Sequence, residues 1–303
     1  MKEMIEPLPL RPGGTIAIVA PAGPLKNDSL ITEAEQLLRS WGYNVVKTPS
    51  CFRKYKDYLA GQSDGHRASD IMKVFADEQI DAILCMRGGY GSNRLIPYFE
   101  HEKFNFAKYA KPFIGFSDLT YLHIYFNQKH GLMTFHGPML KELVREEETT
   151  NEHFLNVISG GHNFDLEEVL FYDHQLPVVA GPLIGGNLSI VCSTLGTPYE
   201  IDTKDKILFL EETEEETYRV DRMIMQLMLA GKLRDAKGII LGDFNVKDKN
   251  CDAVVNSMIA MLKKPTAYEI ESGHGERILT LPMGGLVTMD PARGILSFEG
   301  PRQ

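Results

Sequence analysis

Residues 112–120 read Pro-Phe-Ile-Gly-Phe-Ser-Asp-Leu-Thr and join a short apolar run to a helix-like pattern. The pattern predicts a strand, a sharp turn and a helix, with the hydroxyl of Ser117 at the turn. Such a hydroxyl would stand at the carboxyl edge of a sheet, beside a helix N-terminus that favours negative charge. This geometry suits a serine nucleophile that attacks a carbonyl. Alternatively, Ser117 or Asp118 only caps the helix, since Ser and Asp are common N-cap residues.

Acyl transfer by serine also needs a base that takes the hydroxyl proton and an acid that orients the base. Of the nine histidines, His136 and His274 are expected in glycine-containing turns, where an imidazole is uncrowded. Either one is a candidate base, and a surface turn is the alternative. Glu211 follows the apolar run 207–210, a typical position for a functional carboxylate, although its acidic neighbours also fit a solvated loop.

A glycine-rich loop, Arg87-Gly88-Gly89-Tyr90-Gly91, follows another apolar run. Its backbone N–H groups could form half of an oxyanion hole, with the N–H of Asp118 as the other half. A phosphate-binding loop is the rival, but neither G-x-G-x-x-G nor G-x-x-x-x-G-K-[ST] occurs. The sequence has no HExxH motif, EF-hand loop or Cys/His cluster, so we expect no metal ion and no cofactor.

Composition narrows the class of protein. The 303 residues are 43% hydrophobic and 24% charged, which is ordinary for a globular protein and long enough for two domains. A net charge of -9 without a long basic block argues against nucleic acid as a partner. The four cysteines are far apart, which indicates free thiols in a reducing compartment. We find no signal peptide or membrane span and expect a cytoplasmic protein.

Short apolar runs alternate with helix-like patterns in the first half of the chain. Strands are expected at 15–19, 44–47, 82–86, 111–116 and 133–135, and helices at 30–41, 67–76 and 119–129. This alternation predicts a parallel sheet covered on both faces. In the second half we expect strands at 177–184, 206–210 and 238–241, helices at 218–230 and 253–262, and several short strands within 278–298. The predicted units are an α/β domain (1–145), a linker (146–176) and a carboxy-terminal domain (177–303).

Seven short motifs, in order along nearly the whole chain, resemble those of the LD-carboxypeptidases. They are Arg-Gly-Gly-Tyr-Gly (87–91), Gly-Phe-Ser-Asp-Leu-Thr (115–120), His-Gly-Pro (136–138), Gly-Gly-Asn-Leu (185–188), Leu-Phe-Leu-Glu-Glu (208–212), Tyr-Arg-Val-Asp-Arg (218–222) and Gly-His-Gly (273–275). This is the serine peptidase family of muramoyltetrapeptide carboxypeptidase and the microcin C immunity peptidase. The resemblance implies an amino-terminal α/β domain like that of class I glutamine amidotransferases. It also implies a smaller α+β domain rich in short strands, a site between the domains, and a homodimer.

The resemblance further implies a Ser–His–Glu triad, with Ser117 as nucleophile, His274 as base and Glu211 as the orienting acid. Glu212 is the alternative acid, and Gly89 is chosen over Gly88 as the oxyanion donor that accompanies Asp118. The turn departs from the G-x-S-x-G elbow because Leu119 replaces the second glycine.

The implied function is a cytoplasmic LD-carboxypeptidase that releases the terminal D-alanine of muropeptide tetrapeptides during peptidoglycan recycling. Candidate substrate-binding residues are Arg87, Tyr90 and Asn187, and the arginines 94 and 222 also have the planar fork that suits a carboxylate. One alternative is an immunity-type peptidase that cleaves an aminoacyl–nucleotide conjugate. It would need an aromatic platform, and the sole tryptophan, Trp41, is predicted to face the core. Another alternative is a non-catalytic α/β module that binds a phosphate or sugar at Gly88 and Gly89.

Overall fold

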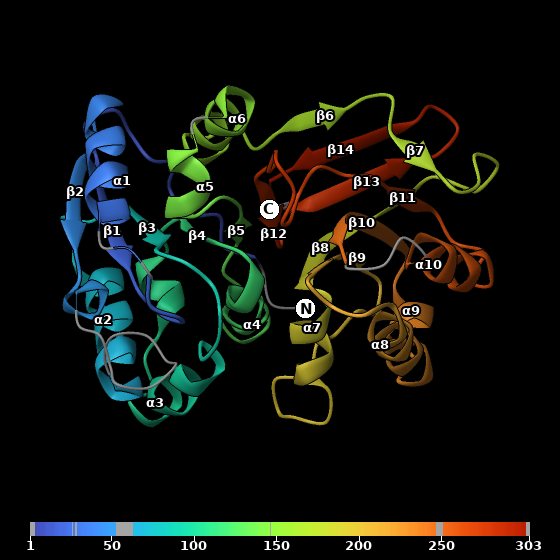
Figure 1. Ribbon diagram of the computed structural model, residues 1–303, viewed down its shortest axis with the longest axis horizontal. Helices are drawn as coiled ribbons and strands as arrows, with labels where there is room; N and C mark the ends of the chain where they lie inside the picture. The colour runs from blue at the N-terminus through green and yellow to red at the C-terminus, as the bar shows by residue number, and fades with distance from the viewer. Residues whose placement is uncertain are drawn as a thin grey trace.

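The computed structural model describes residues 4–25, 27, 29–52, 63–145, 147–246 and 251–300. These residues form two sheets that lie side by side, each packed against its own helices (Figure 1). The amino-terminal half of the chain builds the left part in that view and the carboxy-terminal half builds the right part. The fold is therefore the mixed α/β, two-domain architecture that the sequence predicts.

The first sheet has six strands in the order β12-β5-β4-β3-β1-β2. They are β1 (Thr15–Val19), β2 (Asn44–Lys47), β3 (Ala82–Cys85), β4 (Phe113–Gly115), β5 (Thr134–His136) and β12 (Leu281–Met283). Strands β1 to β5 are parallel, and β12 pairs antiparallel with β5. The chain winds outward from β1 in both directions, so the carboxyl ends of β1 and β3 flank a switch point, where such folds bind ligands.

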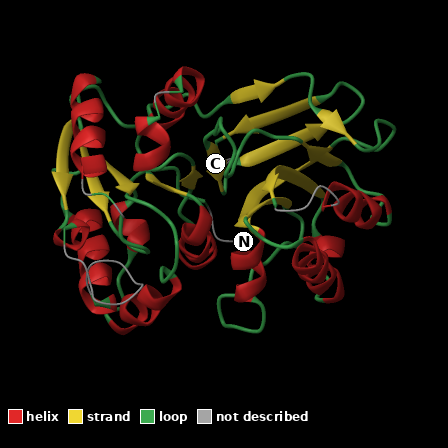
Figure 2. Ribbon diagram, in the orientation of Figure 1, coloured by secondary structure: helices red, strands yellow, loops and turns green. Residues whose placement is uncertain are grey.

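Helices cover both faces of this sheet, as predicted (Figure 2). One face carries α1 (Ser29–Ser40), α5 (Leu140–Val144) and α6 (Glu148–Ile158); the other carries α2 (Asp64–Ala76), α3 (Ile96–His101) and α4 (Thr120–Tyr125). Each helix directs apolar residues at 3–4 residue spacing toward the strands, for example Ile71, Val74 and Phe75 of α2. Strands buried on both faces explain the continuous apolar runs in the sequence.

The second sheet has eight strands in the order β6-β14-β13-β8-β9-β10-β11-β7. They are β6 (Phe164–Leu166), β7 (Leu170–Phe171), β8 (Val179–Asn187), β9 (Ile207–Thr213), β10 (Gly238–Asn245), β11 (Thr266–Tyr268), β13 (Leu286–Asp290) and β14 (Ile295–Glu299). Strands β8 to β11 are parallel and the others antiparallel. One face packs against α7 (Leu188–Thr194), α8 (Thr217–Leu229), α9 (Lys232–Asp235) and α10 (Cys251–Ala260).

Strands β8, β9 and β10 extend further than the sequence predicts, and this changes where the glutamates lie. Strand β8 continues to Asn187, which pairs with Glu211, and Glu212 pairs with Phe244 of β10. Both glutamates therefore lie on β9 and not in a solvated loop after it. The apolar pattern stops at Leu210, but pairing with strands on both sides carries β9 three residues further.

The segment 146–176, expected as a connection, also contains regular structure. Helix α6 packs Phe154, Val157 and Ile158 into the first core, whereas β6 and β7 join the second sheet. The helix expected over 119–129 is divided into a 3-10 turn (Ser117–Leu119), α4 and a π-helical turn (Phe126–His130).

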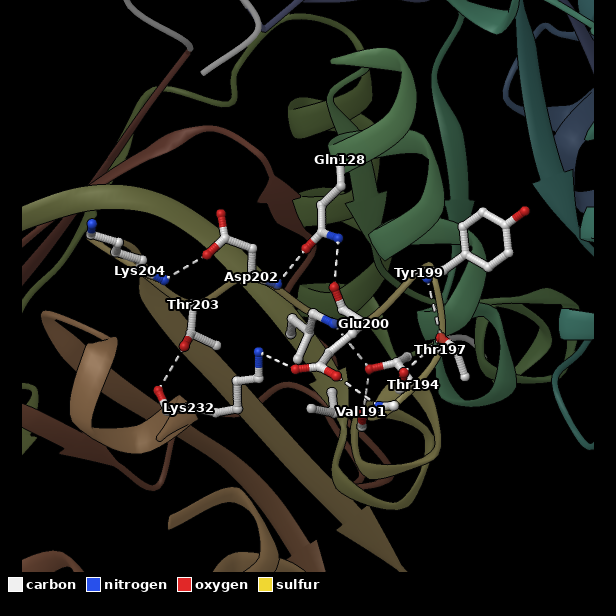
Figure 3. A network of polar contacts seen from close by, with 12 residues as sticks. Gln128, Val191, Thr194, Thr197, Tyr199, Glu200, Asp202, Thr203, Lys204 and Lys232 are labelled. Atoms are coloured by element: carbon white, nitrogen blue, oxygen red, sulfur yellow. Dashed lines mark hydrogen bonds and ion pairs between the residues drawn. The ribbon is translucent and has the colours of Figure 1, made fainter. Parts of the chain in front are cut away.

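Polar contacts connect the two domains through the loop that follows α7 (Figure 3). Gln128 donates from Nε2 to the carbonyl of Glu200 (3.0 Å) and accepts from the N–H of Asp202 (2.7 Å). The Glu200 carboxylate pairs in turn with Lys232 (2.6 Å). Closer to the sheet edges, the N–H of Asn187 donates to Thr120 Oγ1 (3.0 Å). These contacts hold the carboxyl ends of β8 and β9 beside the start of α4.

None of the helices in the described part of the chain has the length and hydropathy needed to cross a bilayer.

Candidate active site

Ser117 lies directly after β4 in a strained backbone conformation. Its φ is +62°, in the left-handed region that non-glycine residues seldom adopt, and the residue is half-buried. The N-cap position of the turn is Phe116, so Ser117 is not the capping residue. Asp118 does not cap either, because its carboxylate accepts the N–H of Ser92 (2.8 Å) while Ser92 Oγ donates to its carbonyl (2.7 Å). The strand–turn–helix geometry thus presents a serine hydroxyl at the sheet edge.

The glycine-rich loop after β3 packs directly on this turn. A Cβ on Gly88 would lie 2.9 Å from Ser117 Cβ and 3.0 Å from its Oγ, so only glycine fits there. The Gly88 carbonyl accepts the N–H of Gly23 (3.0 Å). Because the peptide is trans, this bond leaves the N–H of Gly89 facing away from Gly23, and Gly89 is exposed. The residue before Gly89 therefore contacts the serine, and the N–H of Gly89 does not point at Gly23.

A buried arginine that the sequence reasoning missed connects the loops around Gly88. Arg67 is fully buried on α2, donates from Nη1 to the carbonyls of Pro21 and Gly91, and contacts Asp64 Oδ1 (2.5 Å). The sequence signal for this burial is the position of Arg67 on the apolar face of the helix predicted at 67–76. Arg87, predicted to contact substrate, donates from Nη1 to the carbonyl of Pro24 (2.7 Å).

The second domain contributes a paired imidazole and carboxylate. His274 Nδ1 lies 2.7 Å from Glu211 Oε2, with the Glu211 side chain fully buried and the His274 side chain 22% exposed. The rings of His274 and Phe116 lie 4.8 Å apart between centroids, so the imidazole is next to the Ser117 turn. The structure therefore pairs His274 with Glu211 and places the imidazole against Phe116, the residue before Ser117, although these residues lie far apart in sequence.

Burial and charge act in opposite directions on this imidazole. Burial alone lowers the pKa of His274, but the hydrogen bond to Glu211 and the charge of that carboxylate outweigh burial. The pKa of His274 consequently lies above its usual range. A histidine with such a partner has its tautomer and ring orientation set by the carboxylate.

Glu212, the alternative acid, faces the other side of β9, since successive side chains of a strand alternate. Its carboxylate accepts hydrogen bonds from Asn187 Nδ2 (3.0 Å) and from the N–H groups of Ser189 (2.9 Å) and Thr213 (2.8 Å). Burial raises the pKa of Glu212 despite these bonds. Asn187, predicted to contact substrate, also accepts the N–H of Ile190 through Oδ1 (3.2 Å). Glu212 and Asn187 thus stabilise the start of α7.

His136 does not lie in an open turn as expected. It belongs to β5, pairs with Gly115 and Leu281, and is fully buried. Its Nδ1 lies 3.3 Å from Ser272 Oγ, and burial holds the pKa of His136 well below its usual range. This neutral histidine packs behind the site, because strand pairing on both sides leaves it no exposed position.

The remaining predicted contact residues are Tyr90, Arg94 and Arg222, and each has its own surroundings. Tyr90 is 44% exposed at the tip of the glycine-rich loop. Arg94 pairs with Asp64 (2.7 Å), and Arg222 lines a cavity of about 960 Å³ between α8 and the loop after α7, together with Tyr218. Within the described ranges, no group of three or more His, Cys, Asp and Glu side chains has a geometry that could hold a metal ion.

Comparisons with known proteins match both halves of the chain. Residues 16–137 match the LD-carboxypeptidase N-terminal domain and residues 180–289 the LD-carboxypeptidase C-terminal domain. A probable murein peptide carboxypeptidase of Bacillus subtilis is 35% identical over 97% of this chain and 94% of its own length. The murein tetrapeptide carboxypeptidase of Pseudomonas aeruginosa is 29% identical over 92% of this chain and 94% of its own.

Solved structures share the whole architecture. The crystal structure of muramoyltetrapeptide carboxypeptidase from Oxalobacter formigenes superposes with a TM-score of 0.83 at 30% identity, covering 94% of this chain and 98% of that one. The structure of MccF in complex with glutamyl sulfamoyl guanosine has a TM-score of 0.87 over 98% of both chains. Its 22% identity makes this a likeness of fold alone.

The fold and these relatives define the class as two-domain proteins of mixed α/β structure that are serine-type carboxypeptidases. The chain belongs to the LD-carboxypeptidase family.

Proposed function

We propose that this carboxypeptidase releases the terminal D-alanine of murein tetrapeptides, with Ser117, His274 and Glu211 as its catalytic triad. The observation that carries the proposal is the 2.7 Å contact between His274 Nδ1 and Glu211 Oε2, beside the strained Ser117 turn. An oriented imidazole next to a presented serine hydroxyl is the arrangement that nucleophilic acyl transfer needs. The relatives named as murein peptide and murein tetrapeptide carboxypeptidases support this substrate.

In the first half of the reaction, Ser117 Oγ attacks the carbonyl carbon that precedes D-alanine, and His274 Nε2 takes the hydroxyl proton. Glu211 holds the opposite nitrogen and stabilises the imidazolium. The N–H groups of Asp118 and Gly89 donate to the oxyanion of the tetrahedral intermediate. His274 then gives its proton to the amine of D-alanine as the C–N bond breaks.

In the second half, a water molecule attacks the acyl ester on Ser117 while His274 takes a proton from the water. Collapse of the second intermediate releases the shortened peptide and returns the proton to Ser117 Oγ. The net reaction is hydrolysis of one peptide bond. The proposal includes the role in peptidoglycan recycling, the cytoplasmic location and the homodimer that the family resemblance implies, and Tyr90 and Arg87 are proposed to lie along the substrate path.

The murein peptide is proposed in preference to the rival substrate, an aminoacyl–nucleotide conjugate, for which Trp41 offers no platform. Stacking on a nucleotide base needs an exposed aromatic platform. Trp41 packs against the first core, with its ring centroid 6.5 Å from that of Phe154, as the sequence predicts. Offering both substrates to the purified protein tests this preference.

The deciding experiment compares wild type with Ser117→Ala on a murein tetrapeptide that ends in D-alanine. Mass spectrometry of the products detects the loss of one alanine residue. Removal of a catalytic serine should lower kcat by about 10³-fold or more. Ser40→Ala is the matched control, because its exposed hydroxyl only donates to the Leu37 carbonyl (2.7 Å), and it should keep full activity. Unchanged turnover by folded Ser117→Ala would refute the mechanism.

A further inference from the structure

His274 lies in an irregular loop, Ser-Gly-His-Gly (272–275), and one residue of the second sheet contacts this loop on both sides. The backbone N–H of Asp243 donates to the carbonyl of Ser272 (3.1 Å). The carboxylate of Asp243 accepts, through Oδ2, the N–H of Gly275 (3.1 Å). One contact therefore precedes the histidine in the chain and the other follows it.

The position of Asp243 comes from an irregularity in β10. The register between β9 and β10 shifts between Leu241 and Phe244, which is the signature of a β-bulge. Bulges re-aim side chains and are frequent next to active sites. At Gly275, an added Cβ would lie 2.7–2.8 Å from the Asp243 carboxylate atoms, so the loop approaches that carboxylate as closely as a backbone permits.

We propose that Asp243 is a positioning residue for His274: it holds the 272–275 loop on both sides and so keeps the imidazole between Glu211 and the Ser117 turn. The inference rests on the proposed function, because it concerns the proposed base of that reaction. Asp243 acts through His274 and touches neither Ser117 nor the scissile bond in this scheme.

The charges around Asp243 give the proposal a second, measurable consequence. The pKa of Asp243 is raised to about 6. Burial is the largest cause and the charges of Glu211 and Glu271 add to it, whereas the Gly275 hydrogen bond and the charge of His274 act in the opposite direction. Glu142 and Glu212 add negative charge near the imidazole. Once ionised, Asp243 favours the protonated form of His274, so a neutral residue at 243 should lower the pKa of His274.

Two substitutions separate the hydrogen bond from the charge. Asp243→Asn keeps an oxygen that can accept the Gly275 N–H, whereas Asp243→Ala removes both bond and charge. We expect Asp243→Ala to lower kcat about 10- to 100-fold with little change in KM, since a misplaced group costs this much. Asp243→Asn should retain kcat within about threefold and move the acid limb of kcat/KM to lower pH.

Asp81→Ala is the matched control, because Asp81 Oδ2 accepts the N–H of Thr15 (2.7 Å) beside the first sheet, a bond of the same kind. It should leave kcat unchanged. A folded Asp243→Ala protein with wild-type kcat, or Asp243→Asn as inactive as Asp243→Ala, would overturn the inference. If Asp243→Ala does not fold, the pH profile of Asp243→Asn tests the inference by itself. An acid limb of kcat/KM at the same pH as in wild type would then overturn the inference.

An NMR titration of the His274 imidazole, assigned by comparison with His274→Ala, needs no turnover. Its pKa should be lower in Asp243→Asn than in wild type, and equal values would contradict the coupling. This measurement distinguishes the two hypotheses: wild type that releases no D-alanine would refute the proposed function, and the titration would still test Asp243.

Discussion

The two sides of the candidate site are built by different means. On the side of the first domain, backbone geometry does the positioning: Ser117 has a φ of +62° and Gly88 packs on it with no space for a side chain. On the side of the second domain, carboxylates do it: Glu211 binds the imidazole of His274 and Asp243 binds the loop that carries it. The first side should therefore be sensitive to added volume, and the second to lost charge and lost hydrogen bonds.

The largest effect on kcat is expected from Glu211→Gln. This substitution removes the carboxylate charge that faces His274 and conserves the volume of the side chain. An amide cannot stabilise the imidazolium and favours the wrong tautomer, so kcat should fall about 10³- to 10⁴-fold. Steady-state release of D-alanine measures this. A loss below about tenfold would mean that Glu211 does not orient the base.

Gly88→Ala tests the backbone side and should rank second. The new Cβ must displace Ser117 or the loop, and a shift of that size costs about 10²-fold in kcat. Gly42→Ala is the control, because Gly42 has open space around it and a positive φ (+88°). This substitution should cost about 1 kcal/mol of stability and leave kcat unchanged. Equal kcat values for the two variants would remove the steric argument.

The pH dependence of kcat/KM tests the role of the carboxylate of Glu211 on the side of the second domain. His274 must be neutral to take a proton, and its pKa lies above the usual 6.5 because the Glu211 bond and charge outweigh burial. As pH falls through this raised pKa, kcat/KM should fall about tenfold per unit. The midpoint of the acid limb of kcat/KM should therefore lie above pH 6.5 in wild type. A midpoint below pH 6 would contradict the pairing of His274 with Glu211.

The smallest effect on activity is expected from Glu212→Gln, although Glu212 is the chain neighbour of Glu211, whose substitution should have the largest effect. The N–H of Ser189 and that of Thr213 bond different oxygens of Glu212, so the NH2 of glutamine would face one of these donors. Stability should therefore fall by about 1–2 kcal/mol. Because Glu212 faces α7 and not His274, kcat should stay within about threefold. Denaturant unfolding and D-alanine release measure the two quantities, and a large loss of kcat would show that the glutamates are coupled.

Much of the architecture could be predicted because strands buried on both faces leave continuous apolar runs, such as residues 15–19 and 82–85. Helix α8 is one residue from its predicted start, because Val220, Ile224 and Leu227 repeat at helical spacing. Strand ends were less predictable: β9 continues through Glu211 and Glu212 because of pairing with β8 and β10, which no local pattern records.

For the candidate site, the sequence by itself determined the residue types and the local turns, namely a serine after a strand, glycines after β3 and a histidine between glycines. These are short-range properties of the chain, so spacing and composition carry them. Only the tertiary structure decided that Glu211 faces His274 while Glu212 faces α7, that His136 is buried, and that Arg67 and Asp243 hold the surrounding loops. Those outcomes depend on strand register, a bulge and the contact of two domains, which bring together residues far apart in the chain, such as Phe116 and His274.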